Sequence, residues 1–190
     1  IQRILADPEF IYRSEIEPGE VKPGETYVLS DLELASRLSF FLWSSIPDEE
    51  LISLASRNQL NKPKVLEQQV QRMLKDPRAD AFIENFTGQW LNVRGMAASE
   101  PVVELFPDFD STLRDAYRRE IELFFSSIIE EDRSVTDLLT ADYTFVNERL
   151  AKQYGIPDVY GSQFRRVKLP AEMKERHGLI GKGALLTVTS

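Results

Sequence analysis

Apolar side chains recur at helical spacing along most of this chain. Leu34, Leu38 and Leu42 fall on one stripe with a four-residue period, and residues 109–130 repeat such a stripe over a longer stretch. A period of three to four residues places these side chains on one face of an α-helix, where they can be buried together. The pattern therefore predicts a mainly α-helical protein.

Local signals predict where these helices begin. Ser30 and Glu33 are spaced as a capping box, in which a hydroxyl and a carboxylate satisfy the free N–H groups of a helix start. Pro47 suits the first position of the next helix, because its ring already holds the helical φ angle. The same reasoning assigns caps to three later helices: Asn61 to one over 62–75, Asp76 to one that starts at Pro77, and either Asp108 or Asp110 to a long one over 109–130.

Two short segments near the C-terminal end have strand character. Residues 142–146 alternate between polar and apolar side chains, and residues 164–169 could pair with them as a hairpin. Between them, residues 147–154 return to a helical pattern that Gly155 closes. The sequence thus predicts a mainly α fold, a compact orthogonal helical bundle of about six or seven helices with a minor β-hairpin.

Composition limits the chemistry of the 190 residues. There is no cysteine, which excludes disulfides, thiolate zinc sites, iron–sulfur ligation and c-type haem attachment within this chain. A single histidine excludes His-rich metal sites. We therefore expect no metal site and no cofactor in this chain. Because no apolar run approaches the roughly 18 residues of a membrane span, we also expect no transmembrane segment.

The charge of the chain is acidic and uneven. A net charge of −8 argues against nucleic-acid binding, which depends on neutralising phosphates. The first and third stretches of fifty residues are strongly acidic, whereas the second and the last are basic. This alternation suggests that acidic and basic faces meet inside the fold or across a contact, although a solvated surface of mixed charge would also account for it.

Isolated chemical motifs have plainer explanations. Gly178, Gly181 and Lys182 invite comparison with a phosphate-binding loop, but the glycine spacing is too short. His177 and Met173 lie one helical turn apart, so they could not bind opposite faces of a haem iron. The tryptophans at 43 and 90 could stack on a sugar, but each ends an apolar helical face, which favours packing in the core.

Three stretches together are similar to a known family. They are residues 34–43 running on to Pro47 and Asp48, residues 139–150 running on to Tyr154 and Gly155, and residues 178–190. In this combination the chain resembles the domain-of-unknown-function 1592 family of exported bacterial proteins, which are often fused to cytochrome-c-like domains. The resemblance covers about residues 30–165.

The resemblance implies a cellular location and neighbouring domains, but no activity. It implies an extracytoplasmic location, periplasmic or at the cell surface, and partners that are neighbouring domains of the same parent chain. Haem c is then expected elsewhere in the parent. Residues 1–29 resemble the end of a preceding domain with a turn-rich loop, residues 30–165 form the main helical domain, and residues 166–190 resemble the truncated start of a following domain. The family offers no catalytic residues to carry over.

We therefore expect a helical scaffold or interaction module without catalytic activity of its own, in a larger exported protein for which the resemblance suggests a redox link. The alternative is part of an extracytoplasmic enzyme that acts on polysaccharide or is coupled to electron transfer. Candidate binding residues are polar side chains within the otherwise apolar motifs: Arg37, Asp48, Asp142, Asn147, Glu148 and Arg149. Their plainer role is capping and ion pairing, since Arg and Asp are rarely buried unless paired.

Overall fold

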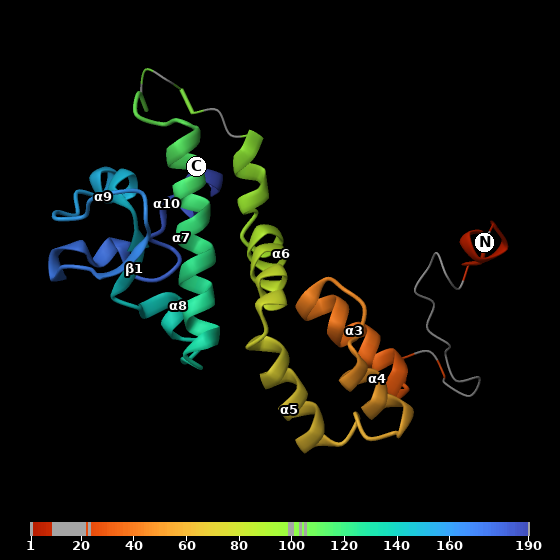
Figure 1. Ribbon diagram of the computed structural model, residues 1–190. Coiled ribbons are helices and arrows are strands. Elements are labelled where there is room, and N and C mark those ends of the chain that lie inside the picture. Colours follow the sequence, from red (N-terminus) through yellow and green to blue (C-terminus); the bar gives the residue numbers. More distant parts are fainter. Residues whose placement is uncertain are drawn as a thin grey trace. The chain divides into compact units, whose positions relative to one another are not determined.

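The computed structural model describes residues 2–8, 22, 24–98, 101, 102, 104 and 106–189. Helices make up most of this structure, and the predicted mainly α class with a minor hairpin is confirmed (Figure 1). The chain divides into two compact units, Ile1–Phe41 with Ser45–Gln71 and Leu42–Ser44 with Arg72–Ser190. None of the helices in the described ranges combines the length and apolarity that a membrane crossing requires.

The first unit is built from short helices. Its elements are α1 (Gln2–Leu5), most of α3 (Asp31–Trp43), α4 (Glu49–Ser56) and most of α5 (Pro63–Leu74). The predicted capping box at the start of α3 is confirmed, because the Ser30 N–H donates to Glu33 Oε2 at 3.0 Å and the Glu33 N–H donates to Ser30 Oγ at 3.3 Å. Buried Asp31 accepts the Leu60 N–H at 2.6 Å and so ties α3 to the turn before α5.

Two predicted helix starts in this unit are wrong. Asp48 is the N-cap of α4 and accepts the Leu51 N–H at 3.0 Å, so Pro47 lies outside the helix rather than at its first position. Asn61 does not cap α5, because its side-chain amide donates to the Leu29 carbonyl at 2.9 Å and to the Asp31 carboxylate. In the first case the adjacent carboxylate caps the helix, and in the second a carboxylate from another helix holds the side chain that was expected to cap it.

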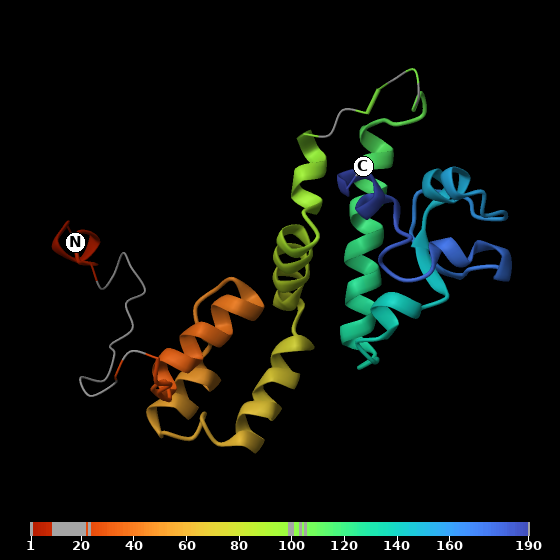
Figure 2. The same ribbon diagram turned by 180° about the vertical axis from the view of Figure 1, so that it is seen from behind.

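The second unit places a long helix beside a small sheet. Its elements are η1 (Pro77–Ala79), α6 (Asp80–Trp90), η2 (Val93–Ala98), α7 (Ser111–Glu130), α8 (Asp137–Thr140), β1 (Tyr143–Val146), α9 (Glu148–Tyr154), β2 (Arg165–Lys168), η3 (Ala171–Arg176) and α10 (Gly183–Thr189). The strands are antiparallel, with Tyr143 opposite Lys168 and Val146 opposite Arg165, which confirms the hairpin. In front and rear views, α7 runs beside α8, β1 and α10 (Figures 1 and 2).

Caps fix the ends of the elements in this unit. Asp76 caps η1 with Pro77 at the next position, as predicted, and α6 follows directly. Asp110 rather than Asp108 caps α7, since its Oδ1 accepts the Leu113 N–H at 2.7 Å. Gly155 closes α9 in the left-handed conformation at φ 72°, which a glycine adopts without strain.

Helix α7 forms the centre of the core of the second unit. Its Ile121 and Phe124 are fully buried and belong to one cluster with residues of β1, α9 and α10. Trp43 is also buried and donates its indole N–H to the Met73 carbonyl at 3.0 Å, so core packing is confirmed for it. For Trp90 that prediction is wrong, because its ring packs on Phe86 yet stays 55% exposed at the end of α6.

Candidate functional site

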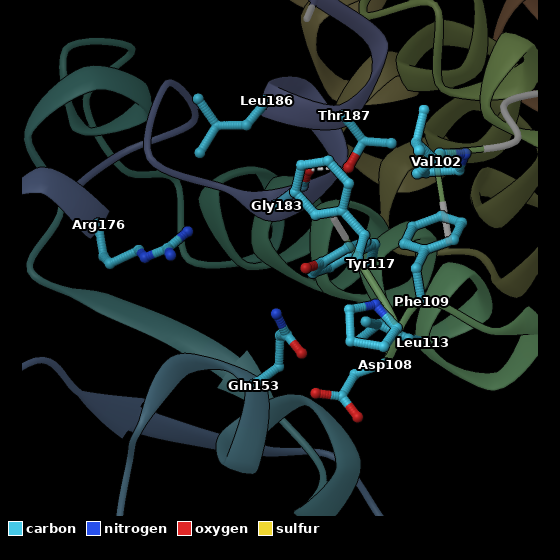
Figure 3. Close-up of a pocket in the computed structure, with 13 residues that line it drawn as sticks. Val102, Asp108, Phe109, Leu113, Tyr117, Gln153, Arg176, Gly183, Leu186 and Thr187 are labelled. Atoms are coloured by element: carbon cyan, nitrogen blue, oxygen red, sulfur yellow. Dashed lines mark hydrogen bonds between the residues drawn. The ribbon is translucent and has the colours of Figure 1, made fainter. Parts of the chain in front are cut away.

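A cleft of about 640 Å³ opens at the N-terminal end of α7, in the second unit (Figure 3). Ligand sites in proteins are commonly of this size and combine apolar walls with a few polar groups. Apolar side chains that line it include Val102, Phe106, Phe109, Leu113 and Leu186, and polar ones are Asp108, Tyr117, Gln153, Arg176 and Thr187. The cleft therefore draws on α7, α9, η3, α10 and the segment before α7.

Close contact between α7 and α10 forms one wall of the cleft. Leu113 and Tyr117 lie one turn apart on α7 and both face the cleft. Gly183 begins α10 directly against the Tyr117 ring, where an added Cβ would lie 2.1 Å from a ring carbon. A glycine is therefore required at 183 for the two helices to approach. Thr187 follows one turn later, and its hydroxyl donates to the Gly183 carbonyl at 2.8 Å.

The polar end of the cleft is formed around Arg176. Its Nη1 donates to the Gly181 carbonyl at 3.2 Å, and its guanidinium carbon lies 4.4 Å from the centre of the Tyr154 ring. In Figure 3 the Arg176 guanidinium and the Gln153 amide point toward the Tyr117 hydroxyl. Burial raises the pKa of Tyr117, and the positive charge of Arg176 opposes this rise. The arginine is thus held in place with its charge directed at the cleft.

A buried cluster of polar side chains lies behind this wall. Glu120 is fully buried on α7, and its carboxylate accepts the Tyr154 hydroxyl at 2.6 Å and the Thr144 hydroxyl. The ammonium of Lys182 lies 3.9 Å from Glu120 Oε1. The Tyr154 oxygen in turn accepts the Gly183 N–H at 2.8 Å. These four side chains, the buried cluster, link α7, β1 and α9 to the start of α10.

Burial dominates the electrostatics of this cluster. It raises the pKa of Glu120, although the Lys182 charge and the two hydroxyl donors work in the opposite direction. It also raises the pKa of Tyr154 well above the ordinary value and lowers the pKa of Lys182 to about 8. Since Glu120 is 0% and Lys182 1% exposed, the cluster holds the wall of the cleft and does not itself meet a ligand.

Comparison with protein families identifies the chain. The model of PSD4, described as a protein of unknown function (DUF1592), matches residues 29–156, about two thirds of the sequence. The chain belongs to this family. The matched region contains Tyr117 and Gln153 of the cleft, while Arg176 and α10 of this DUF1592 chain lie beyond it. Comparisons with curated proteins and with solved structures give no match.

Two of the six predicted binding residues lie in the first unit of this DUF1592 chain. Asp48 caps α4, and Arg37 is exposed on α3, where it lines a shallow surface hollow with Leu34, Leu38 and Phe41. Neither belongs to the unit that holds the cleft. In the described ranges, no three His, Cys, Asp or Glu side chains are grouped so that they could hold a metal ion.

The other four lie in the second unit and each has a local partner. Asn147 accepts the Leu150 N–H at 2.9 Å, Glu148 pairs with Lys152 at 2.6 Å, Arg149 donates to the Asp108 carbonyl, and Asp142 pairs with Lys168 at 3.3 Å. The Lys168 contact lowers the pKa of Asp142, and the Lys152 contact lowers that of Glu148. Arg149 alone of the four contacts a cleft residue, Asp108. A binding role for the six residues stays a prediction.

Sequence reasoning missed the principal residues of the cleft. In the sequence, Tyr117 is one of the apolar positions of the predicted helix over 109–130, and Gln153 and Arg176 belong to no motif. A usable signal existed at Glu120, which lies three residues after Tyr117 and four before Phe124, and so on the same buried face. An acid on an apolar stripe indicates a buried partner, which here is Lys182.

Proposed function

We propose that this chain is a non-catalytic helical interaction module that binds another molecule in the cleft at the N-terminal end of α7. The observation that carries the proposal is the convergence of Arg176, Gln153 and the Tyr117 hydroxyl on one apolar cleft. A site for a small molecule or a peptide usually combines an apolar cavity with a small number of polar groups that point into it. The buried cluster behind the wall would keep this arrangement rigid.

The wider setting of the module is also a proposal. We place it in a larger exported protein, periplasmic or at the cell surface, whose neighbouring domains are its partners. What supports this setting is the resemblance to a family of exported proteins that are often fused to cytochrome-c-like domains; the family match itself describes a protein of unknown function. Covalent haem c needs cysteines, which this chain lacks, so any haem c would belong to another part of the parent.

An enzyme acting on polysaccharide or coupled to electron transfer is the second candidate. Its supporting observation is the buried cluster, since a carboxylate, a phenol and an ammonium group are the side chains used for proton transfer. Glu120 and Lys182 are sealed from solvent, however, and a catalytic group must reach its substrate. This sealing favours binding over catalysis.

A thermal-shift screen tests the binding proposal. The panel contains divalent cations with a chelator control, haem, oligosaccharides, and small organic acids with their neutral amides. A ligand at 100 times its dissociation constant stabilises by about 2.7 kcal/mol, which raises the melting temperature by roughly 5–10 °C in a protein of this size. We expect at least one such shift, and a flat panel would contradict the proposal.

A matched pair of variants assigns the shift to the cleft. Leu186→Trp fills the cleft from α10, whereas Ile180→Trp places the same ring outside it, and both positions are exposed. We expect Leu186→Trp to abolish the ligand-induced shift and Ile180→Trp to retain it. A shift that survives in Leu186→Trp would place binding elsewhere on the protein.

A further inference from the structure

At its cationic end, the cleft presents guanidinium N–H donors that a ligand could use. In the described part of the chain, no carboxylate lies within 4.0 Å of Arg176, whose guanidinium contacts only the Gly181 carbonyl and the Tyr154 ring. A guanidinium group has five N–H donors, so several stay free for a ligand. Because the group is already held in place, binding an anion there would cost little side-chain entropy.

The surroundings of Arg176 add positive potential and neutral hydrogen-bonding groups. Both Arg176 and Arg149 oppose the rise of the Tyr117 pKa that burial causes, so both charges reach this end of the cleft. Among the described residues, neither the Tyr117 hydroxyl nor the Gln153 amide has a hydrogen-bond partner. Asp108 also lines the cleft, but in Figure 3 it lies beyond Gln153, away from Arg176.

The rest of the cleft suits a flat apolar group. The rings of Phe109 and Tyr117 lie 6.4 Å apart at a tilt of 40°, and Leu113 and Leu186 supply aliphatic surface. An engineered cavity of about 150 Å³ already holds benzene. At about 640 Å³, this cleft has room for an aromatic ring and a short acidic substituent. Aromatic walls favour an aromatic occupant through tilted ring contacts.

From this charge complementarity we infer that the cleft binds a small aromatic carboxylate, with the carboxylate on Arg176 and the ring against the side chains of Phe109, Leu113 and Tyr117. Gln153 and the Tyr117 hydroxyl donate to the second carboxylate oxygen. Planar guanidinium and carboxylate groups match each other in two parallel hydrogen bonds, which selects the acid over neutral compounds of the same shape. The inference rests on the proposed function, because it names the ligand class of that cleft.

Titration of the isotope-labelled protein with two probes, followed by NMR of the backbone amides, tests the inference. Phenylacetate and phenylacetamide have the same ring and reach, but only the first is charged. We expect phenylacetate to shift the amide signals of Gly183 and Thr187 and to bind at least tenfold tighter than phenylacetamide. Equal binding of the two probes at these amides would overturn the inference and leave the binding proposal intact.

Two variants connect the preference to Arg176. Arg176→Gln removes the charge, and Arg165→Gln removes an exposed charge that contacts the Tyr160 carbonyl on the hairpin. We expect the tenfold preference to vanish in the first variant and to persist in the second. If Arg176→Gln unfolds, the wild-type comparison of the two probes decides alone. Shifts confined to amides away from the cleft, or no shifts at all, would overturn the inference, and the wider thermal-shift panel would then test the binding proposal separately.

Discussion

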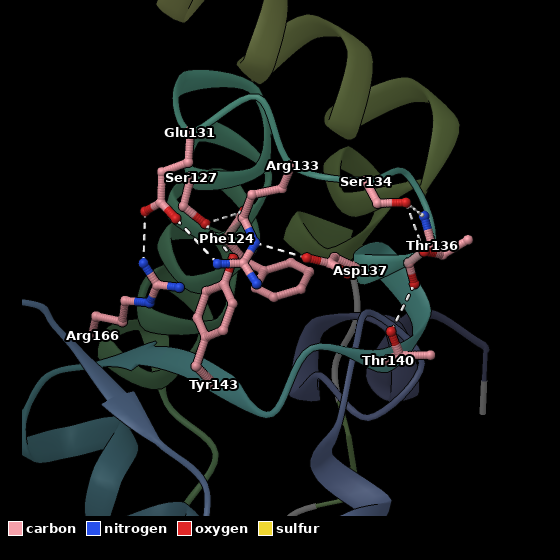
Figure 4. A network of polar contacts seen from close by, with 10 residues as sticks. All are labelled: Phe124, Ser127, Glu131, Arg133, Ser134, Thr136, Asp137, Thr140, Tyr143 and Arg166. Atoms are coloured by element: carbon pink, nitrogen blue, oxygen red, sulfur yellow. Dashed lines mark hydrogen bonds and ion pairs between the residues drawn. The ribbon is translucent and has the colours of Figure 1, made fainter.

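Two polar clusters attach α7 to the hairpin, and they differ in their access to water. The buried cluster joins Glu120 to Lys182, Tyr154 and Thr144. The surface cluster lies at the C-terminal end of α7 (Figure 4). There Glu131 pairs with Arg133 at 3.2 Å and with Arg166 at 2.6 Å. Arg133 also pairs with Asp137 at 2.8 Å. Both guanidinium groups of the surface cluster lie over the Tyr143 ring.

The comparison teaches that burial, more than the kind of pair, decides what a polar contact contributes. Glu120 and Lys182 are at most 1% exposed, whereas Glu131 and Arg166 are 42% and 37% exposed. Removing one partner of a buried pair leaves the other charge without solvent or partner, which is costly. Removing one partner of an exposed pair lets water replace it, so the cost is small.

The largest effect is expected when the buried carboxylate is removed. Glu120→Leu leaves two buried hydroxyl groups without their acceptor, and it leaves the ammonium of Lys182, which still donates to the Tyr143 carbonyl at 3.1 Å, without its counter-ion. We therefore expect a loss of about 3–5 kcal/mol in the free energy of unfolding. The control Glu130→Leu changes an exposed carboxylate on the same helix and should cost no more than about 0.5 kcal/mol. Urea unfolding measures both, and equal losses would contradict the comparison.

A smaller effect, which depends on pH, is expected from the titration of Lys182 on the free energy of unfolding. Burial lowers its pKa from 10.5 to about 8. Between these values the unfolded chain binds more protons than the folded one, so the free energy of unfolding should rise with pH. The raised pKa values of Tyr117 and Tyr154 act in the opposite sense above pH 10, which limits the useful window to pH 8–9.5.

The test compares the wild type with Lys182→Met over this window. We expect the stability of the wild type to gain about 1–2 kcal/mol relative to the variant as the pH rises from 8 to 9.5. The variant keeps an unbranched side chain, one atom shorter than that of lysine, and has no group that titrates there. Parallel stability curves for the two proteins would show that Lys182 keeps its ordinary pKa.

Removing one residue of the surface cluster should lower the free energy of unfolding by about 1 kcal/mol. Arg166→Ala removes both the contact with Glu131 and a guanidinium that lies 3.6 Å from the centre of the Tyr143 ring. Arg165 neighbours it on β2 and is exposed, so Arg165→Ala serves as the control with a smaller loss. If the control lost as much stability as Arg166→Ala, the surface cluster would have no special role.

The smallest expected effect is a difference in how the stability losses at the two clusters respond to salt. In 1 M NaCl the screening length falls to about 3 Å, which weakens exposed ion pairs but hardly reaches buried ones. We expect the cost of Arg166→Ala to shrink by a few tenths of a kcal/mol and the cost of Glu120→Leu to stay unchanged. Repeating the urea unfolding at low and high salt measures this, and an equal response of both variants would refute the distinction.

The parts of the fold that were predicted correctly depend on neighbours in the sequence. The Ser30 capping box, the Asp76–Pro77 start and the Gly155 end each involve residues within a few positions. The role of Asn61 could not be predicted in this way, because its amide is bonded to Asp31, which comes from another helix. Local signals thus located helix boundaries but not the contacts between helices.

The cleft could not be predicted from local sequence patterns, because its residues come from segments far apart in the sequence. Charge blocks gave a partial hint, since the acidic third block and the basic last block were expected to meet or to be solvated. Among the described residues, four ion pairs join these blocks: Lys182 with Glu120, Arg166 with Glu131, Lys168 with Asp142, and Lys152 with Glu148. The position of α10 against Tyr117, which creates the cleft wall, followed from no local pattern.

The pairing of Glu120 with Lys182 also sets an order of events when the chain is synthesised. The ribosome releases Glu120 on α7 well before Lys182, and in that interval the carboxylate has no cation to accompany it into the core. We therefore expect the nascent chain to keep α7 solvated, or Glu120 protonated, until residue 183 has emerged.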